Sequence, residues 1–160
     1  MVPARYDLHS RWSVCAPVEQ VWAVVADPRM SWPDWWPQCT ADAVVSDPAA
    51  GDGLVGRTAR VAFRAWLGYT LHLEIRPTRV QAPHFIEFEA GGDLAGIGRV
   101  ALVPAAGERT TVDIQWLVRP TRRWMLLLSP LARPAFTAAH AGVMRRGERG
   151  LRRRLGDRRS

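Results

Sequence analysis

Residues 56–119 alternate between apolar and polar side chains, and this pattern constrains the fold more than any other feature of the sequence. In its last run, Val112, Ile114 and Trp116 alternate with Asp113. Alternation with a period of two predicts strands that bury one face and expose the other. The pattern therefore predicts an antiparallel sheet with one apolar face, and another element has to cover that face.

The turn between two of these strands predicts their register. The apolar residues of both strands share a face only if a three-residue loop at 66–68 places Phe63 opposite Leu71. That class of loop favours glycine at its third, left-handed position, and residue 68 is glycine. The same register sets Arg60 opposite Glu74 on the outer face, where we expect an ion pair.

The other face of the predicted sheet carries charges of both signs. We interpret it as a solvated face with ion pairs between neighbouring strands and not as an active site. The residues on this face are Arg60, His72, Glu74, Arg76, Glu87, Glu89, Arg99 and Asp113.

The N-terminal third predicts a strand, a helix and a second strand. Residues 5–14 alternate as a half-buried strand does, and residues 40–46 predict a further strand. Between them, Pro17 suits the first turn of a helix and the Asp27–Pro28 pair ends it.

The segment SWPDWWPQC at 31–39 places three tryptophans between two prolines. Proline breaks regular structure, so a long helix is excluded here. We expect Trp32 and Trp35 to be anchored in the core and Trp36 to be partly exposed.

After residue 120 the apolar period changes to that of a helix. Residues 122–129 predict a short helix, and Pro130 and Pro134 separate it from a long helix over 134–155. Gly156 is the expected C-cap. The apolar stripe of the long helix comprises Phe136, His140, Val143, Met144, Gly147, Leu151 and Leu155.

The positive charge of the chain is concentrated at its C-terminal end. Residues 145–160 carry eight arginines and two acidic residues, a net charge of +6 out of +7 for the whole chain. We interpret these arginines as the solvated face of the long helix, and an anionic membrane surface or RNA is the alternative partner. Nucleic acid is disfavoured because the remaining residues form a nearly neutral body, without a basic stripe.

Composition narrows the classes of protein further. The N-terminal residues lack the apolar run of a secretory signal, and no apolar run approaches the length of a membrane span, so we expect a cytoplasmic protein. Cys15 and Cys39 are the only cysteines, and their spacing is not that of a metal site. We therefore predict two free thiols, no metal and no cofactor.

Three segments together resemble a known superfamily. These are PVEQVWAVVADP at 17–28, the W-x-x-W of 32–35, and MRRGERGLRRRL at 144–155. With the strand pattern between them, they are similar to the START-like helix-grip (SRPBCC) superfamily, and within it to the polyketide cyclase/dehydrase and lipid-transport family. The resemblance covers about 5–155, and we expect 1–160 to be a single START-like domain.

The resemblance implies an α+β protein with a helix-grip fold. A curved antiparallel sheet of about seven strands would wrap around the long C-terminal helix, with a helical segment after the first strand. A hydrophobic cavity would lie between sheet and helix and bind a small hydrophobic or aromatic ligand, lipid-like or polyketide-like. The alternative for each wall residue is plain core packing. The candidates are Tyr6, Trp12, Trp35, Trp36, Phe63, Tyr69, Leu71, Phe88, Trp116, Trp124, Phe136, His140 and Met144.

Catalysis is a second hypothesis. Among the polar residues expected to face inward, Ser10, Tyr69, His84 and His140, only His140 lies on the helix stripe, where it would be a general base or a satisfied core histidine. A cyclase or dehydratase would pair it with Tyr69 or Ser10. No family-wide catalytic motif transfers to this chain. A third hypothesis is an interaction module that uses an exposed Trp/Pro segment and the arginine-rich end.

Overall fold

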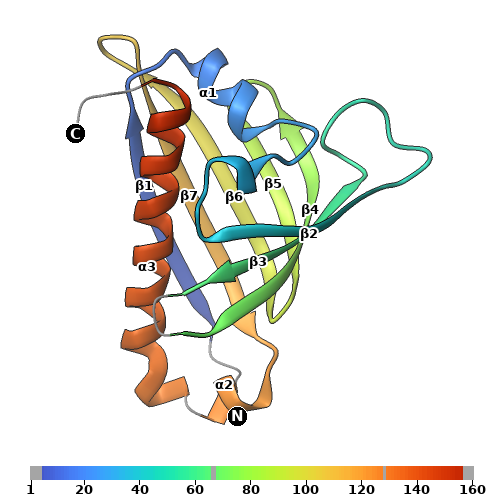
Figure 1. Cartoon of the computed structure of the whole chain (residues 1–160), viewed down its shortest axis with the longest axis vertical. Helices are drawn as coiled ribbons and strands as arrows, with labels where there is room; N and C mark the ends of the chain where they lie inside the picture. The colour runs from blue at the N-terminus through green and yellow to red at the C-terminus, as the bar shows by residue number, and fades with distance from the viewer. Residues whose placement is uncertain (1–4, 66–67, 128, 157–160) are drawn as a thin grey trace.

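The computed structural model describes residues 5–65, 68–127 and 129–156, and within them the chain forms one antiparallel sheet with a long helix beside it (Figure 1). The sheet has seven strands in the order β1-β7-β6-β5-β4-β3-β2, which confirms the predicted fold class. The elements are β1 (Tyr6–Val14), α1 (Val18–Val25), the 3-10 helix η1 (Trp32–Asp34), β2 (Cys39–Ser46), β3 (Arg57–Arg64), β4 (Thr70–Gln81), β5 (Phe85–Gly92), β6 (Leu94–Ala105), β7 (Arg109–Pro120), α2 (Arg123–Leu127) and α3 (Ser129–Arg154).

The hairpin of β3 and β4 has the predicted register. Phe63 pairs with Leu71, and Arg60 pairs with Glu74. The Arg60 Nε atom donates to the Glu74 carboxylate over 3.1 Å on the outer face, so the expected ion pair is confirmed. Gly68 has a φ of +84°, the left-handed conformation that the loop requires. The other two residues of the loop, 66 and 67, lie outside the described residues.

Ion pairs cross the outer face of the sheet at several further places. Arg99 Nε donates to Glu87 over 2.8 Å between β6 and β5, and Arg76 pairs with Glu89 between β4 and β5. The expected ion pairs between neighbouring strands on this face are therefore confirmed. Pairs of this kind between exposed side chains contribute little to stability.

The two edges of the sheet are joined through α3. The sheet is strongly curved, so that β2 and β3 pass in front of β5 and β6, while α3 stands beside β1 (Figure 1). Arg152 on α3 donates to the carbonyl oxygen of Ser13 in β1 over 2.9 Å. On the other side, the indole nitrogen of Trp36, just before β2, donates to the carbonyl oxygen of Val143 over 3.0 Å. The apolar stripe of α3 faces the enclosed interior.

The long helix differs from its prediction at the N-terminal end. It begins at Ser129 and includes Pro134, whereas the sequence predicted a start at 134. Proline removes one backbone hydrogen bond, and a helix of 26 residues retains enough others to continue through it. At the other end, Gly156 has a φ of +74° and its N–H donates to Arg153, which confirms the predicted C-cap.

The Trp/Pro segment packs against α3 more closely than the sequence indicated. Trp35 and Trp36 are 7% and 8% exposed, whereas Trp32 is only partly buried. The expectation that Trp36 would be partly exposed was therefore wrong, whereas Trp32 is half-buried and packs against the core. Trp35 and Trp36 can be buried against α3 because two glycines of that helix, Gly147 and Gly150, leave room for the segment.

Both glycines are close to the tryptophans. A Cβ atom on Gly147 would lie 2.5 Å from the ring of Trp36, and one on Gly150 would lie 1.8 Å from the carbonyl oxygen of Trp35. The backbone of the Trp/Pro segment thus touches the helix backbone, which only glycine permits.

We expect Gly150→Ala to lower the free energy of unfolding by about 1–3 kcal/mol, because the methyl group collides with the backbone of Trp35. A decrease in stability would identify the collision, because replacing glycine by alanine inside a helix normally raises the free energy of unfolding by about 1 kcal/mol. Urea denaturation followed by circular dichroism measures the change. Gly53→Ala is the control, since a Cβ there meets nothing within 4 Å and should change stability little. An unchanged or raised stability of Gly150→Ala would contradict the described packing.

Candidate ligand-binding site

The first cavity, which we name the α2-side cavity, lies between α3 and the end of the sheet nearest α2. It has a volume of about 60 Å³. Its wall is built from the inner faces of β1, β3, β4, β6 and β7 and from the stripe of α3. The lining residues are Leu8, Trp36, Phe63, Ala65, Tyr69, Leu71, Leu73, Leu94, Trp116, Val118, Phe136, Ala139, His140, Val143 and Met144.

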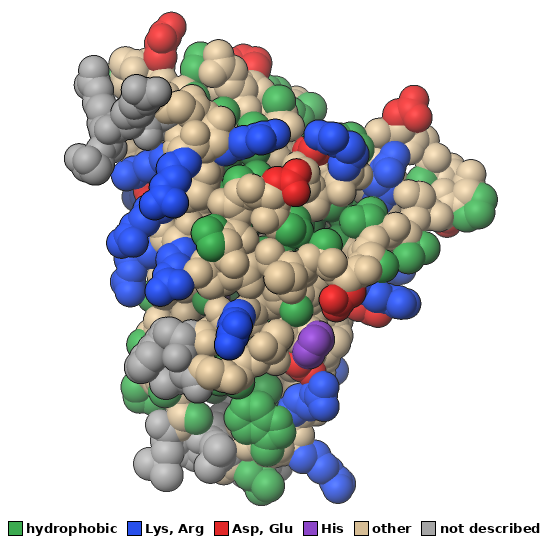
Figure 2. Space-filling view, viewed as in Figure 1, with side chains coloured by type: hydrophobic (Ala, Val, Ile, Leu, Met, Phe, Trp, Pro, Cys, Tyr) green, Lys and Arg blue, Asp and Glu red, His purple; other side chains and the backbone are tan. Residues whose placement is uncertain are grey.

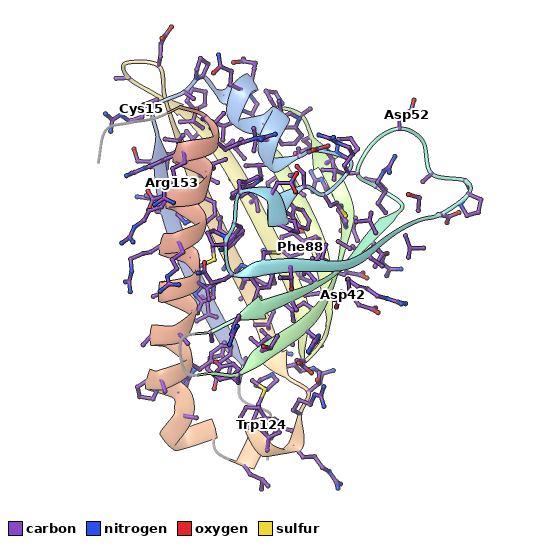
Figure 3. The ribbon with its side chains drawn as sticks, in the orientation of Figure 1. Cys15, Asp42, Asp52, Phe88, Trp124 and Arg153 are labelled. Carbon is purple, nitrogen blue, oxygen red and sulfur yellow. The ribbon has the colours of Figure 1, made fainter. Side chains whose placement is uncertain are left out.

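The second cavity, the α1-side cavity, lies under the end of α1 and the Trp/Pro segment. It has a volume of about 70 Å³. Figure 3 labels Phe88, which projects from β5 into this part of the interior. The lining residues are Trp12, Val25, Trp32, Trp35, Trp36, Leu54, Phe63, Ile75, Pro77, Ile86, Phe88, Val100, Val112, Ile114, Trp116 and Met144.

Four side chains line both cavities and separate them: Trp36, Phe63, Trp116 and Met144. The rings of Trp36 and Phe63 meet edge to face, with their centroids 5.2 Å apart. Met144 is the one unbranched, aliphatic member of this partition, and a methionine side chain adapts its shape more readily than a ring. The two cavities are therefore neighbours, divided by side chains alone.

Neither wall carries a formal charge at neutral pH. The described lining residues include no aspartate, glutamate, lysine or arginine. Burial lowers the pKa of His140 to about 4, so its imidazole is neutral. Burial, with a smaller contribution from Tyr6, raises the pKa of Tyr69, so its phenol is also neutral. The interior is thus apolar and uncharged.

Three side chains that line the cavities each have a nitrogen atom without a hydrogen-bond partner among the described residues. These nitrogen atoms are Nε1 of Trp35, Nε1 of Trp116 and Nε2 of His140, and all three are buried. Leaving such an atom unpaired costs about 1–3 kcal/mol. The indoles of Trp36 and Trp32, by contrast, donate to backbone carbonyl oxygens. The three tryptophan and histidine side chains with a buried unpaired nitrogen thus all line a cavity.

Most of the predicted wall residues are brought together around the two cavities. Tyr6 and Trp124 line neither. Tyr6 is buried, and its ring packs on Phe136 with centroids 4.6 Å apart. Trp124 lies on α2 at the end of the molecule (Figure 3) and is 50% exposed, and its ring is nearly perpendicular to that of Tyr69, with centroids 6.2 Å apart. Their part in ligand binding stays a prediction.

Sequence reasoning missed several lining residues for different reasons. Leu73 and Ile75 follow the alternation of β4, and that signal was sufficient to find them. Ala139 precedes His140 on the helix and is too small to suggest a wall. Leu54 follows a turn cluster, where no periodicity exists to place it.

The expected inward polar residues are only partly inward. His84 is exposed in the turn before β5, where its Nδ1 lies 3.2 Å from the carbonyl oxygen of Leu102, so its inward placement was wrong. Its strand begins one residue later than the alternation indicated. Ser10 lies in β1 opposite Ile114 and lines neither cavity. Within the described residues, His140 makes no hydrogen bond with Tyr69 or Ser10.

Basic side chains collect on the outer surface of α3. Figure 2 shows them along the helix, on the side away from the sheet. Arg152 is the exception, since it is partly buried and binds Ser13 and Glu148. The predicted placement of the other helical arginines off the apolar stripe is confirmed. The exposed ones are Arg145, Arg146, Arg149, Arg153 and Arg154.

The described part of the chain contains neither a membrane-spanning helix nor a cluster of metal-binding side chains. None of its helices is both long and apolar enough to span a bilayer. It also contains no group of three or more histidine, cysteine or acidic side chains arranged to bind a metal ion.

A curved antiparallel sheet closed by a long C-terminal helix, with a short helix after the first strand, defines the START-like helix-grip class. The family model described as "Polyketide cyclase / dehydrase and lipid transport" matches residues 8–156. The chain belongs to this family. A search of curated proteins gives no significant match.

Solved structures share the fold at low sequence identity. A START superfamily protein from Mycobacterium smegmatis is 16% identical, with a TM-score of 0.70 over 94% of this chain and 97% of that one. Norcoclaurine synthase from Thalictrum flavum, crystallised with a transition-state analogue, is 17% identical, with a TM-score of 0.60 over 96% and 99%. The di-domain ARO/CYC BexL from the BE-7585A biosynthetic pathway is 16% identical, with a TM-score of 0.67 over 92% of this chain and 49% of that one.

The buried histidine predicts a pH-dependent stability. His140 has a pKa of about 4 in the folded protein and an ordinary value of 6.5. Between these values the unfolded chain binds a proton that the folded one does not, so stability falls as the pH falls from 6.5 toward 4. We expect a loss of about 2 kcal/mol between pH 8 and pH 5, measured by urea denaturation. In His140→Phe the loss over this interval should be clearly smaller, and an equal loss would contradict the assignment.

Proposed function

We propose that the protein binds a small hydrophobic or aromatic ligand, lipid-like or polyketide-like, between the sheet and α3. The observation that carries this proposal is the uncharged apolar interior, in which three lining side chains carry a buried, unpaired nitrogen. Binding sites for small molecules are mostly apolar, with a few polar groups that orient the ligand. A core that served stability alone would gain from pairing those nitrogens.

A ligand would have to move the partition between the cavities. Each cavity, at about 60 and 70 Å³, is smaller than an engineered cavity of about 150 Å³ that holds one benzene molecule. A ligand with one or more rings would therefore occupy both cavities and displace Met144, the adaptable member of the partition.

Catalysis by a cyclase or dehydratase is the second candidate, and the similarity to a norcoclaurine synthase and to an ARO/CYC di-domain favours it. Two features of His140 weigh against it. Its Nε2 has no polar partner among the described residues, and a pKa of about 4 makes it a weak base at neutral pH. Loss of turnover in His140→Ala with ligand affinity preserved would favour the enzyme.

The third hypothesis, an interaction module, has lost one of its two supports. It required an exposed Trp/Pro segment, but Trp35 and Trp36 are buried against α3. In the part of the chain that the structure describes, the exposed arginines of α3 remain as a surface for such a role.

Native mass spectrometry of the purified protein, followed by extraction into organic solvent, tests the proposed function. We expect a bound apolar molecule, or saturable binding when neutral aromatic compounds and lipids are added. Failure of every such compound to bind would contradict the proposal.

Substitutions of two neighbouring alanines on α3 test where the ligand binds. Ala139 lines the α2-side cavity, whereas Ala138 is exposed. Ala139→Leu should reduce affinity for 2-ethylnaphthalene about tenfold or more by filling the cavity, equivalent to about 1.4 kcal/mol. Ala138→Leu adds the same atoms on the surface and should bind normally. Calorimetric titration measures both, with circular dichroism to verify folding. Equal affinities in the two variants would place the ligand elsewhere.

A further inference from the structure

Two of the side chains that carry an unpaired nitrogen line the same cavity from opposite elements of the fold. Trp116 projects from β7 and His140 from α3, and both line the α2-side cavity. Trp116 is 9% exposed, and its Nε1 is fully buried without a partner among the described residues, as is Nε2 of His140. Trp116 also lines the α1-side cavity and is part of the partition between the two, whereas His140 lines the α2-side cavity alone.

The chemistry of these two groups defines what they can bind. An indole N–H only donates, so Trp116 requires an acceptor. A neutral imidazole has one donor and one acceptor, so His140 accepts a hydroxyl proton or donates to a carbonyl, depending on its tautomer. A ligand oxygen between them, whether carbonyl or hydroxyl, would accept the hydrogen bond from Trp116. Nε2 of His140 would donate to either oxygen in one tautomer and accept a hydroxyl proton in the other.

The rest of the wall limits the ligand's charge. The described lining residues offer no cation to pair with a carboxylate or phosphate and no anion to pair with an amine. Burying an unpaired ion in an apolar site is far more costly than burying a hydrogen-bonded neutral group. Burial itself keeps His140 neutral, so it does not supply the missing positive charge at neutral pH.

We propose that the interior selects neutral apolar ligands that carry a carbonyl or hydroxyl oxygen, held by Trp116 and His140, and rejects carboxylates and other ions. This inference rests on the proposed function and specifies its ligand class. Trp116 and His140 are then the residues that determine specificity within an otherwise apolar wall.

Three ligands of nearly equal shape test the selectivity: 2-ethylnaphthalene, 2-acetylnaphthalene and 2-naphthoate. Calorimetric titration at pH 7.5 gives their affinities. We expect 2-acetylnaphthalene to bind about tenfold more tightly than 2-ethylnaphthalene, since it satisfies buried groups that the hydrocarbon leaves unpaired. We expect 2-naphthoate to bind at least about a hundredfold more weakly than the ketone. Equal affinities of ketone and hydrocarbon, or tight binding of naphthoate, would overturn the inference.

Variants assign the preference to the two residues. In Trp116→Phe and in His140→Phe, the ratio of ketone to hydrocarbon affinity should fall toward one, while the hydrocarbon still binds. Trp22→Phe is the control, because Trp22 is a partly buried residue of α1 that lines neither cavity, and it should retain the wild-type ratio. A ratio unchanged in both wall variants would overturn the assignment, and either variant suffices if the other does not fold.

An independent spectroscopic readout follows the indole itself. In two-dimensional ¹H–¹⁵N spectra, the Trp116 indole signal is identified by its loss in Trp116→Phe. It should move downfield on addition of 2-acetylnaphthalene, and move less with 2-ethylnaphthalene. If no ligand of the series binds at all, the proposed function fails together with the inference. If the hydrocarbon binds but no preference appears, the inference fails alone.

Discussion

The contact of α3 with both edges of the sheet is the interaction on which the rest of the structure depends. The sheet has seven strands and one apolar face, and a single long helix is available to cover that face. The sheet therefore has to curve around the helix to bury its apolar side chains. Arg152 joins the helix to β1, and Trp36 joins it to the segment before β2. Gly147 and Gly150 make the second contact close, because any side chain there would separate the helix from the Trp/Pro segment. The enclosed interior exists because this closure holds.

The interior combines features that a purely structural core does not need. Aromatic rings occupy much of its wall, two small cavities remain, and three buried nitrogens are unpaired among the described residues. Membership of the polyketide cyclase/dehydrase and lipid-transport family is consistent with either binding or catalysis, since a fold hosts functions without specifying them. The decision between them depends on the site, where an isolated neutral histidine supports binding.

The sequence predicted the architecture well because its signals are local. Alternation over 56–119 identified the strands, and the loop geometry placed Arg60 opposite Glu74. The errors occurred where neighbours remote in the chain decide the outcome. Trp36 is buried because glycines more than a hundred residues later admit it, and Pro134 lies inside a helix long enough to continue through it. His84 is exposed because its strand starts one residue further on.

By itself, the sequence determined the period of each element, the faces that become apolar and the register of the hairpin, because these follow from backbone geometry and the order of side chains. Only the tertiary structure decided which aromatic residues enclose space and which fill it. Tyr6 packs against Phe136, whereas Phe63 and Trp116 border both cavities, although all have the pattern of inward residues. The neutrality of His140 likewise arises from burial, which depends on the distances between α3 and the strands and not on its position in the sequence.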